Sequence, residues 1–373
     1  MAHSLVVADA DLAQLVQDGS AASAVMVDTE FMRRDTFFPQ PALLQLCFTN
    51  MPDQAWLIDP LEIEDLTPLR SLFGNTEIVK VLHSASEDLE VFQRWLGVQP
   101  TPLFDTQRAA AFAGIAFSIG YRALVEQFTG EVLDKGETRS DWLRRPLTAS
   151  QMMYAAADVL PLVNVYEQLR TRLDALERTD WVFEDSGLAA AEASRPAAPF
   201  HLKIKSAWKL NRRQLASLAA VCEWREQRAR ALDKPRSWIL ADKVCYALAE
   251  RGPANLSELR SVPDMPQAVV RKQGETLLDL VAEAHGLPAD RLPAPLQSPL
   301  DAGQRSLLKA LKRRAAEIAK GWNIEPEALL PSKDYELLVR MRDEPSSELP
   351  ERWTGWRQDA VILPLLSLSR EGV

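Results

Sequence analysis

Short apolar runs separated by turn residues fill the first half of the chain. Runs rich in Val, Ile, Leu and Phe predict strands, and runs with an apolar residue every three to four positions predict helices. The strands are expected at residues 25–31, 43–49, 55–59, 78–83 and 103–104, and the helices at 66–73, 84–96, 106–112 and 119–128. The first three strands are joined by short turns, which require antiparallel pairing. The pattern therefore predicts an α/β fold with a mixed sheet flanked by helices.

The second half has a helical period from residue 211 onward. Two stretches rich in Pro or Ala, at residues 189–199 and 285–299, are expected to be linkers. Each of the two helical units that follow them has about 75 residues, enough for a small bundle. The chain is thus predicted to contain an α/β domain and two small all-α domains, at residues 1–200, 208–288 and 298–373.

Composition places the chain among ordinary globular proteins, because 47% of its 373 residues are hydrophobic and 25% are charged. No apolar run approaches the roughly 18 residues of a membrane span, and the first residues lack the features of a secretory signal. Cys47, Cys222 and Cys245 lie far apart and form no zinc or disulfide pattern. We therefore expect a cytoplasmic protein with reduced thiols and no membrane partner.

Charge distinguishes the two halves of the chain. Residues 1–200 carry a net charge of −14 and residues 201–373 a net charge of +5, within a total of −9. An acidic surface repels nucleic acid or holds cations, whereas a basic one attracts phosphate. The basic residues at 203–213 and 309–320 either contact phosphates or form solvated surface.

Two acids share one face of the first predicted strand. Side chains alternate along a strand, so Asp28 and Glu30 project to the same side. Carboxylates this close repel each other unless a cation or a proton lies between them. The alternative is a solvent-exposed strand face, which is common in antiparallel sheets.

A third acid lies on the apolar face of a predicted helix. Asp88 falls within the apolar arc of residues 84–96, whereas Glu87 and Glu90 face solvent. Ser84 and Glu87 fit a capping box that starts this helix. An inward acid at a helix start either accepts bonds from backbone amides or belongs to a site.

A fourth acid accompanies a tyrosine on another apolar stripe. Tyr154 and Asp158 lie four residues apart, in a helix that Thr148 and Gln151 cap and that Pro161 is expected to kink. A hydrogen bond from the tyrosine to the acid for structural reasons is the alternative.

Acids on three elements without nearby His or Cys patterns favour Mg²⁺ or Mn²⁺ over zinc. Such sites serve phosphoryl transfer by two metal ions.

These residues carry a resemblance to a known family. The segments at residues 28–31, 86–89 and 154–158 are similar to the three exonuclease motifs of the DEDD superfamily in its tyrosine subclass. Together with residues 134–147 they resemble the ribonuclease D family. Residues 214–242 resemble the HRDC domain, a helical nucleic-acid-binding module of that family. The segment 298–373 is similar to a second HRDC domain in length and helical period.

The resemblance implies a ribonuclease H-like exonuclease fold and a 3′-to-5′ exoribonuclease that releases nucleoside 5′-monophosphates from tRNA precursors and other stable RNAs. It implies two divalent metal ions, Mg²⁺ or Mn²⁺. No protein partner is implied, and we expect a monomer, although the sequence does not determine the oligomeric state. Asp28, Glu30 and Asp158 would hold one metal, Asp28 would bridge to the second, and Asp88 would support the second through water. Tyr154 would orient or deprotonate the attacking water.

The resemblance also suggests a pocket for the 3′-terminal nucleotide, formed by Thr29, Phe31, His83 and Trp142. For His83 the alternative is a polar residue at a strand end, and for Trp142 it is a core position. Two other functions stay open. The first is a DNA exonuclease, which uses the same motifs. No motif reports contacts to the 2′-hydroxyl, so the motifs do not distinguish RNA from DNA. A non-catalytic RNA-binding factor is the second alternative.

Overall fold

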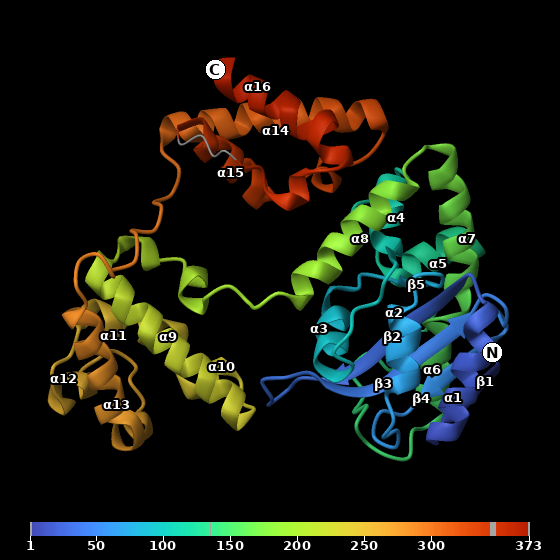
Figure 1. Ribbon diagram of the computed structural model, residues 1–373, viewed down its shortest axis with the longest axis horizontal. Coiled ribbons are helices and arrows are strands. Elements are labelled where there is room, and N and C mark those ends of the chain that lie inside the picture. The colour runs from blue at the N-terminus through green and yellow to red at the C-terminus, as the bar shows by residue number, and fades with distance from the viewer. Residues whose placement is uncertain (1, 135, 344–347, 372–373) are drawn as a thin grey trace. The chain divides into compact units, whose positions relative to one another are not determined.

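The computed structural model describes residues 2–134, 136–343 and 348–371 and separates them into two compact units (Figure 1). One unit comprises Met1–Met32, Gln40–Arg195 and Leu300–Val373, and the other comprises Arg33–Pro39 and Pro196–Pro299. The sheet and the helices around it therefore share a unit with the C-terminal segment. The predicted boundaries at residues 200, 208, 288 and 298 stay predictions.

The first unit is built on a six-stranded mixed sheet with the order β1-β4-β3-β2-β5-β6. β2, β3 and β4 pair antiparallel as predicted, and β5 and β6 continue the sheet in parallel. The sequence pattern missed β1, which pairs parallel to β4 at the edge. The strands are β1 (Ala2–Val6), β2 (Ala24–Met32), β3 (Gln40–Phe48), β4 (Gln54–Ile58), β5 (Val79–Leu82) and β6 (Leu103–Asp105).

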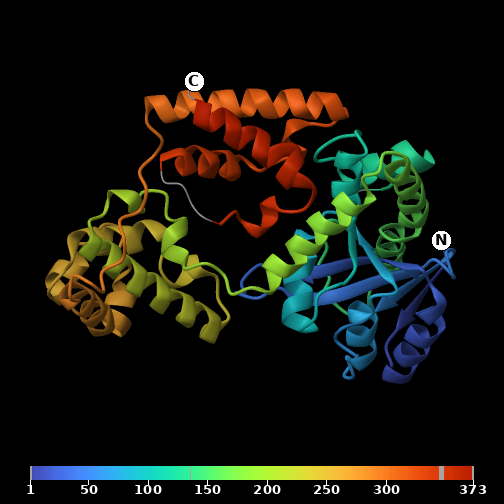
Figure 2. The same ribbon diagram turned by 45° about the horizontal axis from the view of Figure 1, so that its top comes forward.

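Helices cover both faces of this sheet, which confirms the predicted fold class. Figure 2 shows α1 and α2 on one side and α7 on the other. Alternate residues of β2 enter the two cores, so Val25 and Val27 pack with α1 to α3, and Met26 packs with α4, α5 and α7. The helices are α1 (Asp9–Asp18), α2 (Thr67–Gly74), α3 (Ser86–Trp95), α4 (Thr106–Phe112), α5 (Tyr121–Thr129), α6 (Ala149–Ala157), α7 (Leu160–Ala175) and α8 (Thr179–Ser194).

Three local expectations are wrong. The predicted capping box at Ser84 does not form, because Ser84 adopts a positive φ of 59° and its amide bonds the carboxylate of Asp105 instead. Pro161 does not kink one helix but lies in the first turn of a second one, where its missing amide costs nothing. The first part of the expected linker, residues 189–194, completes α8 and buries Ala190.

The C-terminal segment of the first unit is helical and shares a core with the sheet domain. It contains α14 (Ala302–Trp322), α15 (Ser332–Asp343) and α16 (Leu363–Glu371). Trp356 stacks on Trp181 of α8 with ring centroids 4.2 Å apart, and Arg178 donates to the carbonyls of Phe112 and Trp322. The same buried cluster includes side chains of α4, α7, α14, α15 and α16. The segment is thus part of one packed body.

The second unit is an all-α bundle with its own core. Its helices are α9 (Arg212–Leu232), α10 (Arg236–Ile239), α11 (Asp242–Arg251), α12 (Leu256–Arg260) and α13 (Gln267–Gly286). The tip of the β2–β3 hairpin belongs to this unit, since the amides of Phe37 and Phe38 both donate to Asp233. The guanidinium carbons of Arg230 and Arg236 lie 4.7 and 4.5 Å from the centre of the Phe37 ring.

Short 3₁₀ and π segments complete the described backbone. They are η1 (Gly19–Ala21), η2 (Phe200–Lys203), η3 (Ala207–Lys209), η4 (Pro326–Ala328), η5 (Glu351–Trp353) and η6 (Gln358–Ile362). Among the described helices none is long and apolar enough to cross a membrane.

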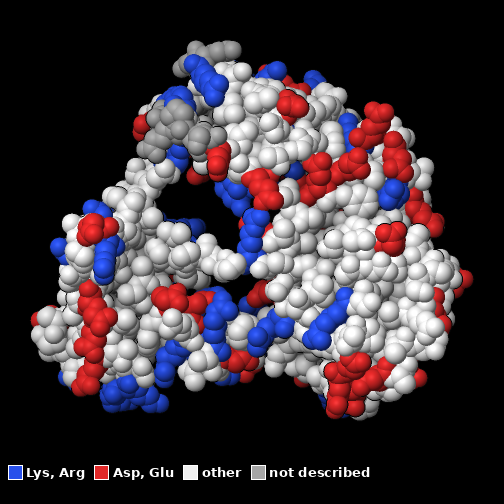
Figure 3. All heavy atoms as spheres, viewed as in Figure 1, with Lys and Arg blue, Asp and Glu red and all other residues white. Residues whose placement is uncertain are grey.

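The basic excess of the second half lies in the all-α unit. Residues 201–299 carry a net charge of +5, whereas residues 300–373 carry none. Lys and Arg side chains gather on the visible face of this unit near the ends of α10 and α13 (Figure 3). Two arginines of the predicted basic run have structural contacts, because Arg212 donates to the carbonyls of Ala289 and Leu292 and Arg213 to that of Leu287.

Candidate active site

Three carboxylates converge at the middle of the sheet. Asp28 and Glu30 project from the same face of β2, as alternation requires, and Asp158 lies at the C-terminal end of α6. One carboxylate oxygen of each lies within 4.8 Å of the other two. The alternative, a solvent-exposed strand face, does not form, since all three side chains are at least partly buried.

Burial and mutual repulsion raise the pKa of every acid in this cluster. Burial is the largest cause for Asp28, whose pKa lies well above its usual range, and the charges of Asp158, Asp88 and Glu30 add to it. Burial and the same two aspartates raise the pKa of Glu30 to about 9. Burial raises the pKa of Asp158 to about 7, against the lowering effect of Arg122. Without a cation the cluster therefore binds protons at a pH at which free carboxyl groups are ionised.

Asp88 approaches this cluster from α3 without joining it. Its side chain is buried, as the apolar arc predicted, and accepts a hydrogen bond from the hydroxyl of Thr29. Burial raises the pKa of Asp88 to about 7 although that hydrogen bond lowers it. The charge of Asp88 still raises the pKa of Asp28 and Glu30. Asp88 therefore acts on the cluster from its edge.

Tyr154 stands one helical turn before Asp158 on α6. The predicted capping box holds the start of this helix, with Thr148 and Gln151 each bonding the backbone of the other. Half-burial and the charge of Asp158 raise the pKa of the Tyr154 phenol, so the hydroxyl stays protonated at neutral pH. The Trp142 and Tyr154 rings are neighbours at a tilt of 47°, with centroids 6.0 Å apart.

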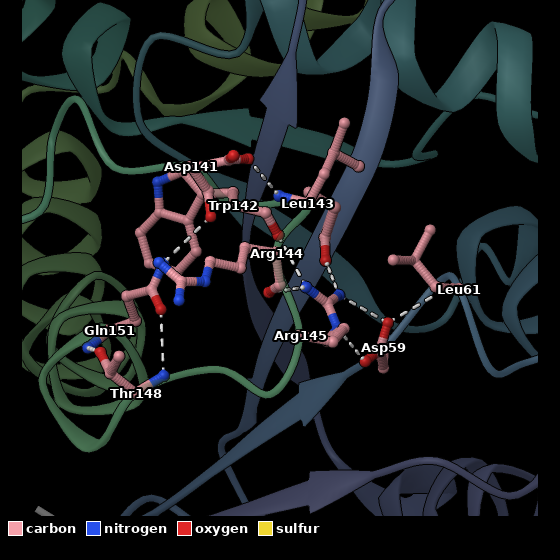
Figure 4. A network of polar contacts seen from close by, with 10 residues as sticks. Asp59, Leu61, Asp141, Trp142, Leu143, Arg144, Arg145, Thr148 and Gln151 are labelled. Atoms are coloured by element: carbon pink, nitrogen blue, oxygen red, sulfur yellow. Dashed lines mark hydrogen bonds and ion pairs between the residues drawn. The ribbon is translucent and has the colours of Figure 1, made fainter.

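A buried ion pair anchors the segment that precedes α6 (Figure 4). The Nε and Nη2 atoms of Arg145 donate to the two carboxylate oxygens of Asp59, at 2.5 and 2.6 Å. Arg145 also donates to the carbonyls of Ala42 on β3 and Trp142, both at 2.7 Å. Asp59 is only 1% exposed, so this bidentate pair ties the segment to the sheet. It thereby fixes the start of α6 and the position of Tyr154.

The carboxylates open into a cavity of about 510 Å³. It is lined by Val27, Asp28, Glu30, His83, Gly120, Tyr121, Arg122, Ala123, Thr138, Tyr154, Asp158 and Leu162. His83 lies at the end of β5 and pairs through Nδ1 with the hydroxyl of Thr106, at 3.0 Å. Burial lowers the pKa of its imidazole, which favours the neutral ring.

The other predicted pocket residues lie outside this lining. Trp142 is 2% exposed and belongs to a core cluster with Leu43 and Leu57, so the core alternative holds and base stacking does not. Thr29 is buried against Asp88, and Phe31 is absent from the cavity wall. Lys135, within the segment that resembles the known motif, lies outside the described residues.

Sequence reasoning missed Gly120, Tyr121, Arg122 and Thr138. Tyr121 and Arg122 begin α5, and the Tyr121 hydroxyl donates to the carbonyl of Ala157 beside Asp158, at 2.9 Å. Arg122 could have been noticed, because a cation in the first turn of a helix opposes the helix dipole. The other residues have no distinctive pattern in the sequence.

The donor set fits divalent cations. All the candidate donor atoms are hard carboxylate oxygens, and these carboxylates repel one another unless a cation lies between them. Asp28, Glu30 and Asp158 are the residues that would hold such an ion. The cavity beside them leaves room for a phosphate group and a nucleoside.

We expect the stability of the metal-free protein to fall as pH rises from about 5.5 to 8.5. The folded-state pKa values of Glu30, Asp88 and Asp158 are raised above the unfolded values near 4, so the folded protein binds more protons than the unfolded chain across this window. Mg²⁺ should therefore raise the melting temperature by several degrees at pH 8.5 and by less at pH 5.5. Thermal unfolding with EDTA or Mg²⁺ at both pH values tests this, and an equal Mg²⁺ effect at both would contradict it.

Comparison with known proteins places this geometry among nucleases. Residues 4–174 match the family model of a 3′-5′ exonuclease domain, and residues 214–281 match that of the HRDC domain. The ribonuclease D of Pseudomonas paraeruginosa is 40% identical over 362 residues, covering 96% of this chain and 95% of that protein. The ribonuclease D of Escherichia coli is 36% identical over 376 residues, covering 100% and 99%.

The fold agrees with a solved structure over the same length. The crystal structure of Escherichia coli RNase D, described as an exoribonuclease involved in structured RNA processing, superposes with a TM-score of 0.93 at 35% identity. The match covers 100% of this chain and 99% of that one.

Proposed function

Because the chain belongs to the ribonuclease D family and is a 3′-to-5′ exoribonuclease, we propose that it hydrolyses RNA with two divalent metal ions, Mg²⁺ or Mn²⁺. The observation that supports this best is the buried cluster of Asp28, Glu30 and Asp158. Water attacks the terminal phosphodiester, the bond to the 3′ oxygen of the preceding nucleotide breaks, and a nucleoside 5′-monophosphate leaves. We further propose that the RNA substrates are tRNA precursors and other stable RNAs, and that the protein acts as a monomer.

The acids have distinct roles in this proposal. Asp28, Glu30 and Asp158 would hold one metal ion, and Asp28 would also contribute to holding the second. Asp88, held by Thr29 at the edge of the cluster, supports the second ion through water. When bound, the ions supply Lewis acidity and lower the pKa of a coordinated water. Strand β2 holds Asp28 and Glu30, and helices α6 and α3 hold Asp158 and Asp88, so the carboxylates are in place before substrate arrives.

Tyr154 orients the attacking water. Tyr154 lines the cavity one turn before Asp158, and the raised pKa of its phenol leaves the hydroxyl protonated and able to donate or accept a hydrogen bond. His83, also on the wall, is neutral and faces the same space. The main chain near Thr29 and the side chain of Phe31 stay proposed contacts of the terminal nucleotide, whereas the buried Trp142 packs against the Tyr154 ring.

Replacing Tyr154 by Phe should reduce the rate of RNA hydrolysis by roughly 100-fold. The ring and its contact with Trp142 remain, so RNA affinity and thermal stability should stay close to those of the unchanged protein. Single-turnover kinetics together with equilibrium RNA binding separate the two effects. An equal loss of rate and affinity would show that the hydroxyl positions substrate rather than water.

The proposed function is tested with labelled RNA and DNA of matched sequence in the presence of Mg²⁺, Mn²⁺ or EDTA. We expect stepwise shortening of RNA from its 3′ end, nucleoside 5′-monophosphates as products, and no reaction in EDTA. Faster degradation of DNA would favour the DNA exonuclease alternative. Metal-dependent shortening of a tRNA precursor with a 3′ extension, down to the mature end, would support the substrate assignment.

A further inference from the structure

Arg122 is the one Lys or Arg in the wall of the active-site cavity formed by the described residues. It lies in the first turn of α5, between Tyr121 and Ala123, which also line the cavity. The described structure gives its guanidinium group one hydrogen bond, to the Thr138 hydroxyl at 3.4 Å, and no ion pair. Four of its five N–H donors therefore remain available for another partner.

Arg122 shares the cavity wall with the proposed catalytic residues. Arg122 lines the same cavity as Tyr154 and Asp158, the third proposed metal-binding carboxylate, and its positive charge lowers the pKa of both groups. Thr138, its hydrogen-bond partner, is on the same wall. The guanidinium thus approaches the space in which a phosphate must lie for attack.

Fold stability does not account for this arginine. α5 begins after Gly120, and the first turn of a helix favours negative rather than positive side chains. No carboxylate pairs with Arg122 among the described residues to compensate for that unfavourable position. A half-buried cation that opposes its own helix dipole and forms no ion pair among the described residues is well suited to bind an anion supplied by the substrate.

We propose that Arg122 binds the phosphate of the 3′-terminal nucleotide, the group that becomes the 5′-phosphate of the released product. This inference rests on the proposed exoribonuclease function and adds a specificity residue to it. The planar guanidinium can bond two non-bridging oxygens and offset the repulsion between phosphate and the three carboxylates. The terminal nucleotide is thereby recognised through its phosphate, whereas its base and sugar contact other parts of the wall.

The test compares binding of adenosine 5′-monophosphate with binding of adenosine, which lacks the phosphate. Calorimetry with Mg²⁺ measures both ligands without any hydrolysis, on the full-length protein and on Arg122→Ala, Arg122→Lys and Arg172→Ala. Arg172 is an exposed residue of α7, so its variant removes the same charge away from the cavity. Thermal unfolding establishes that each variant is folded.

Arg122→Ala should weaken binding of the monophosphate by about 10-fold or more, since a charge-assisted hydrogen bond is lost, and leave adenosine binding within twofold. Arg122→Lys should restore part of the affinity, and Arg172→Ala should change neither ligand. Unchanged monophosphate binding in Arg122→Ala, or an equal loss for both ligands, would overturn the proposal. A protein that hydrolyses no RNA with Mg²⁺ or Mn²⁺ would instead refute the proposed function, which the RNA assay measures separately.

Discussion

Replacing Asp28 by Asn is expected to reduce RNA hydrolysis by about 1000-fold, because a metal ligand worth several kcal/mol of transition-state stabilisation is lost. The amide has the same shape as the carboxylate, so the strand register between β2 and β3 should persist. Asp28 is also the acid on which Asp158, Asp88 and Glu30 all act. Removal of its charge relieves that repulsion, and the metal-free variant should melt at a higher temperature than the unchanged protein.

Turnover of a labelled RNA with saturating Mg²⁺ measures the loss, and thermal unfolding in EDTA measures the gain in stability. Asp53→Asn is the matched control, since Asp53 is an exposed carboxylate in the turn before β4. It should leave both quantities unchanged. Near-normal turnover of Asp28→Asn would show that the carboxylate cluster is not the catalytic site. Lower activity accompanied by lower stability would indicate damage to the fold instead.

Removal of residues 300–373 is expected to abolish cooperative unfolding of the first unit. This segment supplies α14, α15 and α16 to a core cluster that also contains buried residues of α4 and α7. Its loss would expose Phe112 and Trp181, leave the guanidinium of Arg178 without the Trp322 carbonyl, and remove Trp356 from its stack. All proposed metal ligands lie before residue 200, but the shared core predicts that a fragment without residues 300–373 does not fold cooperatively.

A point variant of the same interface avoids the ambiguity of a truncation. Trp356→Ala in the full-length protein should destabilise it by about 3 kcal/mol, as for other large aromatic residues removed from a packed contact. Trp238→Ala is the control, because Trp238 is 62% exposed and its removal should have little effect. Denaturant unfolding followed by circular dichroism measures both variants. Cooperative unfolding of a fragment that ends near residue 200 would contradict the shared core.

The individual catalytic candidates could be predicted from the sequence because charged side chains occupy positions where the period of a strand or helix predicts apolar ones. Asp28 and Glu30 interrupt an apolar strand, and Asp88 lies on the apolar face of a helix. Strand and helix periods assign such residues to a face without any knowledge of tertiary structure. The cap of α6 by Thr148 and Gln151 was equally local, since its atoms lie within four consecutive residues. The failed capping box at Ser84 shows the limit, because a distant carboxylate, Asp105, competes for the same amide.

Sequence by itself thus determined strands β2 to β6, helices α2 to α5, the pairing of β2, β3 and β4 and the faces on which the acids lie, because these depend on neighbours along the chain. Only the tertiary structure decided which groups meet. It placed Asp28, Glu30 and Asp158 within 4.8 Å of one another while leaving Asp88 at the edge, and it brought Arg122 to the same cavity. It also joined residues 300–373 to the core of the sheet domain. These outcomes depend on contacts between segments far apart in the chain, where burial and charge act through space and no periodicity records them.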